Sequence, residues 1–434
     1  MSLNLSNIKH VHFIGIGGIG ISAIARMMLH EGKKVTGQDM QDSEIITELR
    51  KAGADITIGQ SFDNIPSDAD LIVYTIAIEN YDPELFTRLK NQSIPIRSYP
   101  EMLHVVTEGK HTIAVAGTHG KTTTTGMIAQ ILRDTHKDPT VIIGSLLIGE
   151  KSNFIAGKSE YFIVEACEYR RSFLNINPTV LVITNIDADH LDYYKDIEDI
   201  KSAFRALALK VPASGYVVCN PNDENIADVI KDIPATIIDV SKFLTQTITL
   251  KIPGIHNRKN ASSSLAVAEV IGIPDTEARS ALAQFPGTWR RFEYKGVLSS
   301  GAKVYDDYAH HPVEIEATLE GFRELYSRAD GWKITIVFQP HLFSRTKLLL
   351  DEFAVSFAGA DRVLLLPIYY AREEDDGSIS SEILAQKISN TEAHAFGDFQ
   401  TAESYIRSLA LDDKDIIVTM GAGEANKITD RLLL

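Results

Sequence analysis

The segment 117–125 combines residue types and a spacing that can bind phosphates. It reads G-T-H-G-K-T-T-T-T and follows the apolar run 111–116, which is expected to be a strand. In a loop of this type, backbone amides surround the phosphates, a lysine supplies a point charge and a hydroxyl ligates magnesium. Lys121 and Thr122 stand at those two positions. The sequence therefore predicts an ATP site with Mg²⁺, formed by Gly117, Thr118, His119, Gly120, Lys121, Thr122 and Thr123.

This loop departs from the strict P-loop pattern at one position. The strict pattern has a glycine six residues before the lysine, where this chain has Val115. We interpret the loop as a variant whose first glycine is Gly117.

A carboxylate and an imidazole are expected to converge on the same loop. Glu165 ends the predicted strand 161–166, and His190 follows the predicted strand 180–186. The carboxyl ends of parallel strands share one edge of a sheet, and ligands bind there. We predict that Thr122, Glu165 and His190 organise magnesium. His190 could instead be a loop histidine bonded to backbone, and the acidic residues around it could be helix caps or solvated charges.

A second glycine-rich loop lies near the start of the chain. Residues 15–20 read G-I-G-G-I-G between the predicted strand 10–15 and the predicted helix 21–31, and Asp39 ends the next predicted strand. Such a loop binds a diphosphate at a helix N-terminus, and an acid at this spacing binds a ribose. The pattern does not identify the nucleotide, because NAD, FAD and UDP-sugars share both groups. A tight strand–helix turn without a ligand is the alternative.

Composition narrows the class of protein. The 434 residues favour two to four domains, and 44% hydrophobic and 23% charged residues are typical of folded proteins. The net charge of −15 disfavours nucleic acid as a partner. No apolar run is long enough to predict a membrane span or a signal segment. Two cysteines cannot form a disulfide framework. We expect a cytoplasmic protein, either a monomer or a weak homodimer.

The chain alternates predicted strands, tight turns and helices, which is typical of parallel α/β sheets. Further strands are expected at residues 34–38, 70–74, 94–97, 303–305, 333–339, 362–367 and 415–420. We predict three α/β domains. They are an N-terminal Rossmann-like nucleotide-binding domain at 1–109, a central ATP-binding domain with a P-loop-type parallel sheet at 110–287, and a C-terminal Rossmann-like domain at 288–434. The polar stretch 287–291 is the expected hinge.

Motifs along nearly the whole chain resemble those of the Mur ligase family. In family order they are G-T-H-G-K-T-T-T-T, E-A-C-E-Y-R-R-S-F-L at 165–174, T-N-I-D-A-D-H at 184–190, G-I-H-N-R-K-N at 254–260, R-R-F-E at 290–293, D-D-Y-A-H-H-P at 306–312 and F-Q-P-H-L-F-S-R-T at 338–346. The first glycine loop and the segments 306–312 and 338–341 are most similar to the branch that adds L-alanine.

The resemblance implies an ATP-dependent ligase of peptidoglycan precursor synthesis that forms an amide through an acyl phosphate. The first domain would bind UDP-N-acetylmuramate and not a nicotinamide cofactor. The middle domain would bind ATP and Mg²⁺. The third would bind L-alanine and close over the ATP.

The resemblance also implies roles for single residues. The sugar nucleotide would be bound by Gly15, Gly17, Gly18, Gly20, Asp39 and Thr75. The ATP would contact Asn257 and Asn260 near the adenine, and Arg291 and Asp307 from the third domain. The amino acid would be bordered by His310, His341 and Arg345, with Arg170 or Arg171 as a further carboxylate clamp. The catalytic set would be Lys121, Glu165, His190, His310 and Arg345.

Three features depart from the family pattern. Related ligases carry a carbamylated lysine after the D-H motif, where this chain has Phe204-Arg205, and the alanine-adding branch generally lacks it. Many relatives have a basic residue at the position of Leu342, which leaves more of the carboxylate clamp to Arg345. The chain is also short between about residues 211 and 253, so the middle domain is expected to be trimmed.

Several roles and functions stay open. His310 could accept the proton of the attacking amine, but His310, His311 and His341 could equally be hydrogen-bonding scaffold. One of the two arginines could form an ion pair with Glu168 instead of a clamp. The rival functions are a tripeptide ligase of cell-wall recycling, a folate polyglutamate ligase, a nicotinamide-dependent dehydrogenase with an appended ATPase, and a non-catalytic nucleotide sensor.

Overall fold

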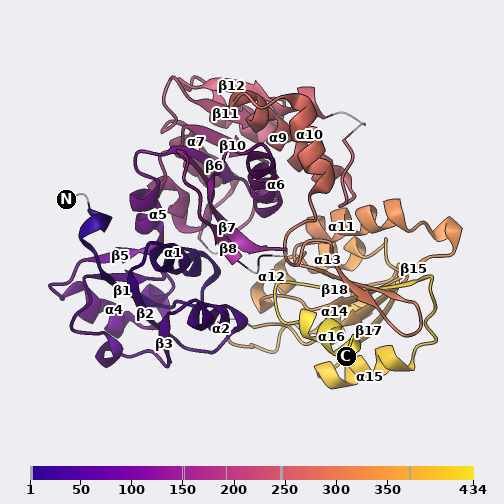
Figure 1. Ribbon diagram of the computed structural model, residues 1–434. Helices are drawn as coiled ribbons and strands as arrows, with labels where there is room; N and C mark the ends of the chain where they lie inside the picture. The colour runs from indigo at the N-terminus through magenta and orange to yellow at the C-terminus, as the bar shows by residue number, and fades with distance from the viewer. Residues whose placement is uncertain (1–2, 149, 151, 192, 245–247, 371–372) are drawn as a thin grey trace. The chain divides into compact units, whose positions relative to one another are not determined.

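The computed structural model describes residues 3–148, 150, 152–191, 193–244, 248–370 and 373–434 (Figure 1). The strands of these residues form three sheets. The chain divides into two compact units, the first comprising Met1–Thr249 and Lys259–Phe285 and the second Leu250–Arg258 and Pro286–Leu434. None of the described helices is long and apolar enough to cross a membrane.

The first sheet is fully parallel, with the strand order β3-β2-β1-β4-β5. Its strands are β1 (His10–Ile14), β2 (Lys34–Asp39), β3 (Asp55–Ile58), β4 (Leu71–Tyr74) and β5 (Ile96–Ser98). Its helices are α1 (Ile19–His30), α2 (Glu44–Lys51), α3 (Ile78–Tyr81), α4 (Pro83–Lys90) and α5 (Tyr99–Thr107). The strand order reverses between β1 and β4, and ligands bind beyond such a reversal. The predicted Rossmann-like N-terminal fold is confirmed.

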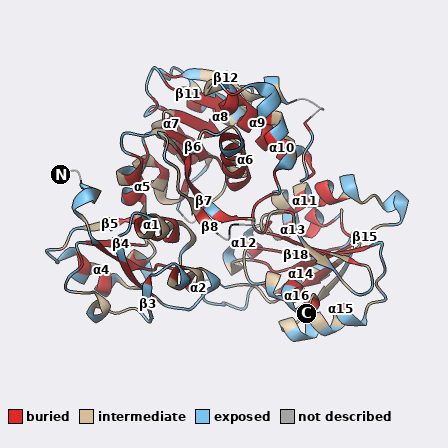
Figure 2. Cartoon of the chain, in the orientation of Figure 1, coloured by how far each residue is buried: buried red, intermediate tan, exposed pale blue. Residues whose placement is uncertain are grey.

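The second sheet has the order β12-β11-β10-β6-β9-β7-β8, in which only β8 runs antiparallel to its neighbour. Its strands are β6 (His111–Ala116), β7 (Thr140–Leu147), β8 (Ser152–Ile155), β9 (Tyr161–Glu165), β10 (Val180–Ile183), β11 (Tyr216–Cys219) and β12 (Thr236–Asp239). The associated helices are α6 (Lys121–Asp134), α7 (Ile197–Ala208), α8 (Glu224–Ile230), α9 (Ile255–Val270) and α10 (Asp275–Gln284). The central strands are continuous apolar runs because helices cover both faces of a parallel sheet (Figure 2).

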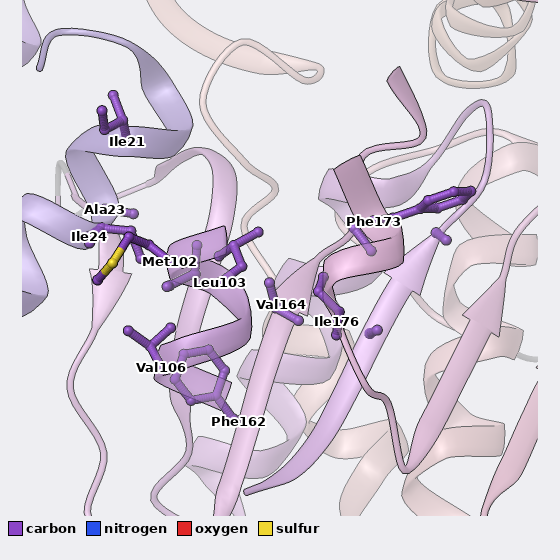
Figure 3. Packing of buried hydrophobic residues seen from close by; sticks show 14 of the residues in the cluster. Ile21, Ala23, Ile24, Met102, Leu103, Val106, Phe162, Val164, Phe173 and Ile176 are labelled. Atoms are coloured by element: carbon purple, nitrogen blue, oxygen red, sulfur yellow. The ribbon is translucent and has the colours of Figure 1, made fainter. Parts of the chain in front are cut away.

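One continuous hydrophobic core joins the first two sheets. Figure 3 shows Ile24 of α1 and Leu103 of α5 in the same cluster as Phe162 of β9 and Phe173, which belongs to the 3₁₀ helix η3 (Tyr169–Asn175). All four of these side chains are buried. Burial of apolar surface is the main favourable term in folding, so the two sheets stabilise each other.

The third sheet, in the second unit, has the order β13-β14-β18-β15-β16-β17, with only β13 antiparallel. Its strands are β13 (Glu293–Val297), β14 (Lys303–Asp307), β15 (Lys333–Phe338), β16 (Arg362–Leu365), β17 (Glu392–Ala395) and β18 (Asp415–Met420). Its helices are α11 (Pro312–Leu325), α12 (Phe343–Leu348), α13 (Leu350–Ser356), α14 (Ser381–Lys387), α15 (Phe399–Ser408) and α16 (Asn426–Leu432). The expected hinge at 287–291 lies just inside this unit, which resumes at Pro286.

A row of polar side chains is buried in the first sheet. His10 Nε2 and His12 Nδ1 each lie 2.9 Å from Thr36 Oγ1, and Gln38 Nε2 lies 3.2 Å from His12 Nε2. The oxygen of Gln38 accepts a hydrogen bond of 2.7 Å from the Ser61 amide. Burial, with a smaller effect of His10, lowers the pKa of His12 from 6.5 to about 4. His12 is therefore neutral in the folded protein at pH 7.

We expect the first unit to lose stability when the pH falls below about 6.5, the pKa of an unfolded histidine. Below this pH His12 is protonated in the unfolded chain, whereas in the folded protein it stays neutral down to about pH 4. The free energy of unfolding should therefore fall by roughly 2 kcal/mol between pH 7 and pH 5. In His12→Gln, urea unfolding followed by circular dichroism should show a smaller loss over this range.

The exposed His104 supplies a matched control, His104→Gln. Both tryptophans, Trp289 and Trp332, lie in the second unit, so their fluorescence reports a transition that His12→Gln should leave unchanged. An equal loss of stability in wild type and His12→Gln would show that another group titrates.

Candidate functional site

The predicted phosphate loop connects β6 to α6 at the carboxyl edge of the second sheet. Gly117 and Gly120 have φ angles of 137° and 81°, a backbone region that favours glycine. A Cβ on Gly120 would lie 2.4 Å from Oδ1 of Asn260 in α9. The loop is shaped by the T-N-I-D segment, because the Thr184 hydroxyl donates to the His119 carbonyl at 2.6 Å and Asn185 Oδ1 accepts from the His119 amide at 2.8 Å.

Lys121 begins α6 and points back into the loop. Its ammonium donates to the Gly117 and Thr118 carbonyls at 2.5 and 3.0 Å and forms an ion pair of 2.9 Å with Glu168. Burial is the largest single influence and lowers the pKa of Lys121, but the charge and hydrogen bond of Glu168 together with Cys167 and Glu165 raise it by more, so the net shift is upward. The lysine is therefore a fixed positive charge inside a loop of backbone groups.

Glu168 connects the phosphate loop to His190 by contacting both Lys121 and His190. Its side chain is 3% exposed and also lies 3.6 Å from His190 Nε2. Burial raises the pKa of Glu168, while Lys121 and His190 lower it by more, so the carboxylate stays ionised. The alternative of an ion pair between Glu168 and Arg170 or Arg171 is wrong for the described residues, because the charged partners of Glu168 there are Lys121 and His190.

The two arginines have other partners. Arg171 forms an ion pair of 2.6 Å with Asp199 of α7. Arg170 lies 3.6 Å from Glu79 and 3.4 Å from the Ile76 carbonyl, both beyond the end of β4 in the first sheet. Arg170 thus lies where the loops of the two sheets of the first unit meet.

Glu165 and Thr122 form the oxygen pair that the sequence predicted for a metal. The Thr122 hydroxyl donates to Glu165 Oε1 at 3.0 Å, and the Gly144 amide donates to Oε2 at 2.8 Å. Hydroxyl and carboxylate oxygens are hard ligands of the kind Mg²⁺ takes together with substrate phosphates. These two residues therefore fit the ion. His190 pairs with Glu168 instead, and the described residues contain no ready-made group of three or more His, Cys, Asp or Glu around a metal position.

The first glycine loop lies at the reversal of the first sheet. Gly15 has φ 75°, and a Cβ there would lie 2.4 Å from Cγ2 of Thr75, which follows β4. The Gly17 amide donates to Asp39 Oδ2 at 2.8 Å. The structure thus brings together the predicted diphosphate loop, Asp39 and Thr75 at one edge. Asp39 stands at the position predicted to bind a ribose, and its carboxylate also holds the glycine loop by accepting this hydrogen bond.

In the second unit, His310, His341 and Arg345 lie together beyond β14 and β15. The two imidazole centroids are 6.1 Å apart, and Arg345 Nη1 lies 3.3 Å from His341 Nδ1. His310 Nδ1 lies 3.3 Å from Glu314 Oε2. Burial lowers the pKa of His310, and burial with the nearby His310 and Arg345 lowers that of His341 to about 3. Both imidazoles are therefore neutral at pH 7.

The residues predicted to reach the nucleotide from the C-terminal part are held within their own unit. Asp307 is buried and accepts hydrogen bonds from the Phe292 and Ala309 amides at 2.7 and 2.8 Å. Arg291 lies over the Tyr308 ring at 5.1 Å. Asn257 belongs to the second unit and donates to the Pro253 carbonyl, whereas Asn260 belongs to the first. Their contacts with ATP remain predictions.

Sequence reasoning gave no role to several residues that build this site. Glu168, Thr184 and Asn185 lie inside the E-A-C-E and T-N-I-D motifs, so the motifs were the signal that could have found them. Gly144, on the unpredicted strand β7, carried no local signal. A Cβ there would lie 2.5 Å from Glu165 Oε1, which explains why the position needs glycine.

Three family models match successive parts of the chain. They are the Mur ligase family, catalytic domain, at residues 10–111, the Mur ligase middle domain at 115–247, and the Mur ligase, glutamate ligase domain, at 290–423. Together they cover most of the sequence.

Full-length relatives agree with these matches. The chain is 41% identical to a UDP-N-acetylmuramate–L-alanine ligase of Acetivibrio thermocellus, covering 99% of this chain and 97% of the relative. It is also 41% identical to the ligase of the same name from Clostridium acetobutylicum, covering 100% of both chains.

Solved structures share the fold. A UDP-N-acetylmuramate–alanine ligase from Thermotoga maritima has a TM-score of 0.81 at 27% identity and 98% coverage of both chains. A murein peptide ligase from Psychrobacter arcticus has a TM-score of 0.71 at 25% identity, also with 98% coverage of both. With family models along its length and relatives above 40% identity, the chain belongs to the Mur ligase family.

Proposed function

We propose that the protein is an ATP-dependent ligase that joins L-alanine to the lactyl carboxylate of UDP-N-acetylmuramate. The observation that carries this proposal is the 41% identity over full length to ligases of that name, in a chain that keeps Lys121, Glu168 and His190 in contact at the phosphate loop. The product would be a precursor of peptidoglycan, so the protein would serve cell-wall synthesis and, through it, cell shape and division.

The subsites follow the three sheets. UDP-N-acetylmuramate would bind at the first glycine loop, ATP at Lys121, and L-alanine near His341 and Arg345. The domains would span 1–109, 110–287 and 288–434. We place the reaction in the cytoplasm because it consumes ATP and both cysteines are free thiols. The oligomeric state, monomer or weak homodimer, remains a prediction.

The first step would be phosphoryl transfer. A lactyl carboxylate oxygen attacks the γ-phosphorus, the bond from that phosphorus to the bridging oxygen breaks, and ADP leaves. Lys121 offsets the charge on the phosphate oxygens, and the backbone loop holds them in place. Mg²⁺ held by Thr122 and Glu165 would supply further positive charge beside the phosphates.

The second step would be amide formation. The amine nitrogen attacks the acyl carbon, inorganic phosphate leaves, and the amine loses a proton. Arg345 suits the amino acid's carboxylate, because a guanidinium binds carboxylates with paired hydrogen bonds. His310 is neutral at pH 7 and can accept the proton.

Phosphate release should require ATP, Mg²⁺, UDP-N-acetylmuramate and L-alanine together. The assay supplies L-alanine, glycine, L-serine or the stem tripeptide in turn. Lys121→Ala should lower the rate on the order of 100-fold or more, because a positioned cation at the transferring phosphate is lost. Lys110→Ala, at an exposed lysine of the same unit, is the control. Release only with tripeptide would assign the recycling ligase. If folded, ATP-binding protein released no phosphate with any acceptor, the ligase function would be excluded and a nucleotide sensor would remain.

Glu168→Gln should shift the alkaline limb of the pH–rate profile to lower pH. Removing the carboxylate takes away the largest influence that raises the pKa of Lys121, so burial lowers this pKa and the ammonium loses its proton at lower pH. Rates would be measured between pH 7 and pH 10. Glu150→Gln, which removes a carboxylate paired with Arg133 at 2.6 Å, should keep the wild-type limb. An unchanged limb in Glu168→Gln would exclude this role.

Gly144→Ala should weaken activation by magnesium by about tenfold. The added methyl group would lie 2.5 Å from Glu165 Oε1 and would displace the carboxylate from Thr122. The measurement is the Mg²⁺ concentration that gives half-maximal phosphate release. Gly397→Ala is the control, because a Cβ there meets nothing within 4 Å. Equal Mg²⁺ requirements in the two variants would contradict the metal position at Glu165.

A further inference from the structure

A pocket separate from the glycine loops lies in the first unit between α1 and β8. Its volume is about 350 Å³. It is lined by Arg26, Leu29, His30, Ala52, Ser152, Phe154 and Ala156. Arg26 comes seven residues after the start of α1, about 10 Å along the helix axis from the first glycine loop. The pocket is therefore not part of the predicted diphosphate site.

Arg26 brings an unpaired charge to this pocket. Its Nε and Nη2 atoms are buried without a hydrogen-bond partner, and the guanidinium forms no ion pair with any residue that the structure describes. Glu48, whose charge acts on Arg26, forms an ion pair of 2.9 Å with Lys51. Burial lowers the pKa of Arg26, although an arginine remains protonated at pH 7. A buried donor without a hydrogen-bond partner costs free energy. A ligand that accepts hydrogen bonds from Arg26 would remove this cost.

The lining specifies the chemistry of a partner. Arg26 and His30 supply basic groups, and none of the described lining residues is a carboxylate. The Ser152 hydroxyl already donates to the Phe154 carbonyl at 2.7 Å. The rest of the wall is apolar, and the Phe154 ring meets His30 edge-on with centroids 6.1 Å apart. A planar guanidinium matches a planar carboxylate through paired hydrogen bonds, and an aromatic wall favours a flat apolar body.

We propose that this pocket binds a small organic carboxylate with an aromatic or similarly flat apolar body. The carboxylate would pair with Arg26, and the apolar body would lie against Phe154 and Leu29. A volume of about 350 Å³ suits a small molecule of this kind.

The position of the pocket connects it to the nucleotide-binding end of α1. Asn153 of β8 donates hydrogen bonds to the Ile19 carbonyl and to the Ser22 hydroxyl, the latter at 2.9 Å. The same two elements therefore meet at the N-terminus of α1 and around the pocket. A ligand that contacts both should stabilise their packing and raise the melting temperature of the first unit.

Phenylacetate is a suitable probe, with phenylacetamide as the uncharged analogue and inorganic phosphate as an anion without an apolar body. Ligand-observed NMR on the full chain should show phenylacetate binding with a Kd of about 1 mM. Arg26→Met should weaken this binding about tenfold or more, because a charge-assisted pair is lost. Lys34→Leu, which removes a solvent-exposed cation of the same sheet, should bind like wild type.

The melting temperature separates a binding arginine from a structural one. Arg26→Met removes a half-buried guanidinium with two buried nitrogens that lack hydrogen-bond partners, so the variant should melt at or above the wild-type temperature. A clear drop would show that Arg26 serves packing and would overturn the proposal. Equal binding of phenylacetamide, unchanged binding in Arg26→Met, or phosphate binding as tight as phenylacetate would also overturn it.

Discussion

The buried ion pair between Lys121 and Glu168 is the interaction on which the phosphate site depends. Each charge would be costly to bury alone, and each shifts the pKa of the other toward the ionised form. The pair joins the loop after β6 to the loop after β9, and His190 adds the loop after β10. Three neighbouring parallel strands thus end at one charged cluster, at the loop proposed to bind the phosphates of ATP.

The shared core of the first two sheets gives this site a fixed relation to the first glycine loop, the proposed sugar-nucleotide site. The β7–β8 hairpin contacts residues beside both loops. Gly144 of β7 donates a hydrogen bond to Glu165, and Asn153 of β8 donates one to Ser22 near the start of α1. Arg170 adds a third connection, to the loop after β4. Phosphoryl transfer needs its reactants aligned within fractions of an ångström, and a rigid connection between two substrate loops serves that need.

Local sequence signals predicted many of the strands and both glycine loops, because these patterns lie within a few consecutive residues. The apolar runs 111–116 and 415–420 coincide with β6 and β18, and both glycine loops follow strands as expected. The β7–β8 hairpin, the partner of Glu168 and the shared core were not predictable in this way. They depend on contacts between residues distant in sequence, such as Asn153 with Ser22 or Glu168 with Lys121, for which a single sequence carries no period or spacing.

The histidines of the second unit show how burial can prepare a site for amide chemistry. A protonated imidazole beside Arg345 would repel the guanidinium and could not accept a further proton. The neutral imidazole avoids both problems. Burial keeps His310 and His341 neutral, and Glu314 offsets part of that effect at His310 alone. Burial and the nearby His310 and Arg345 lower the pKa of His341 to about 3. Since a base works best when its pKa is near the working pH, a pKa of about 3 makes His341 a poor acceptor of the amine's proton. His341, stacked on Tyr369 at 5.5 Å, is better suited to holding the amino acid in place.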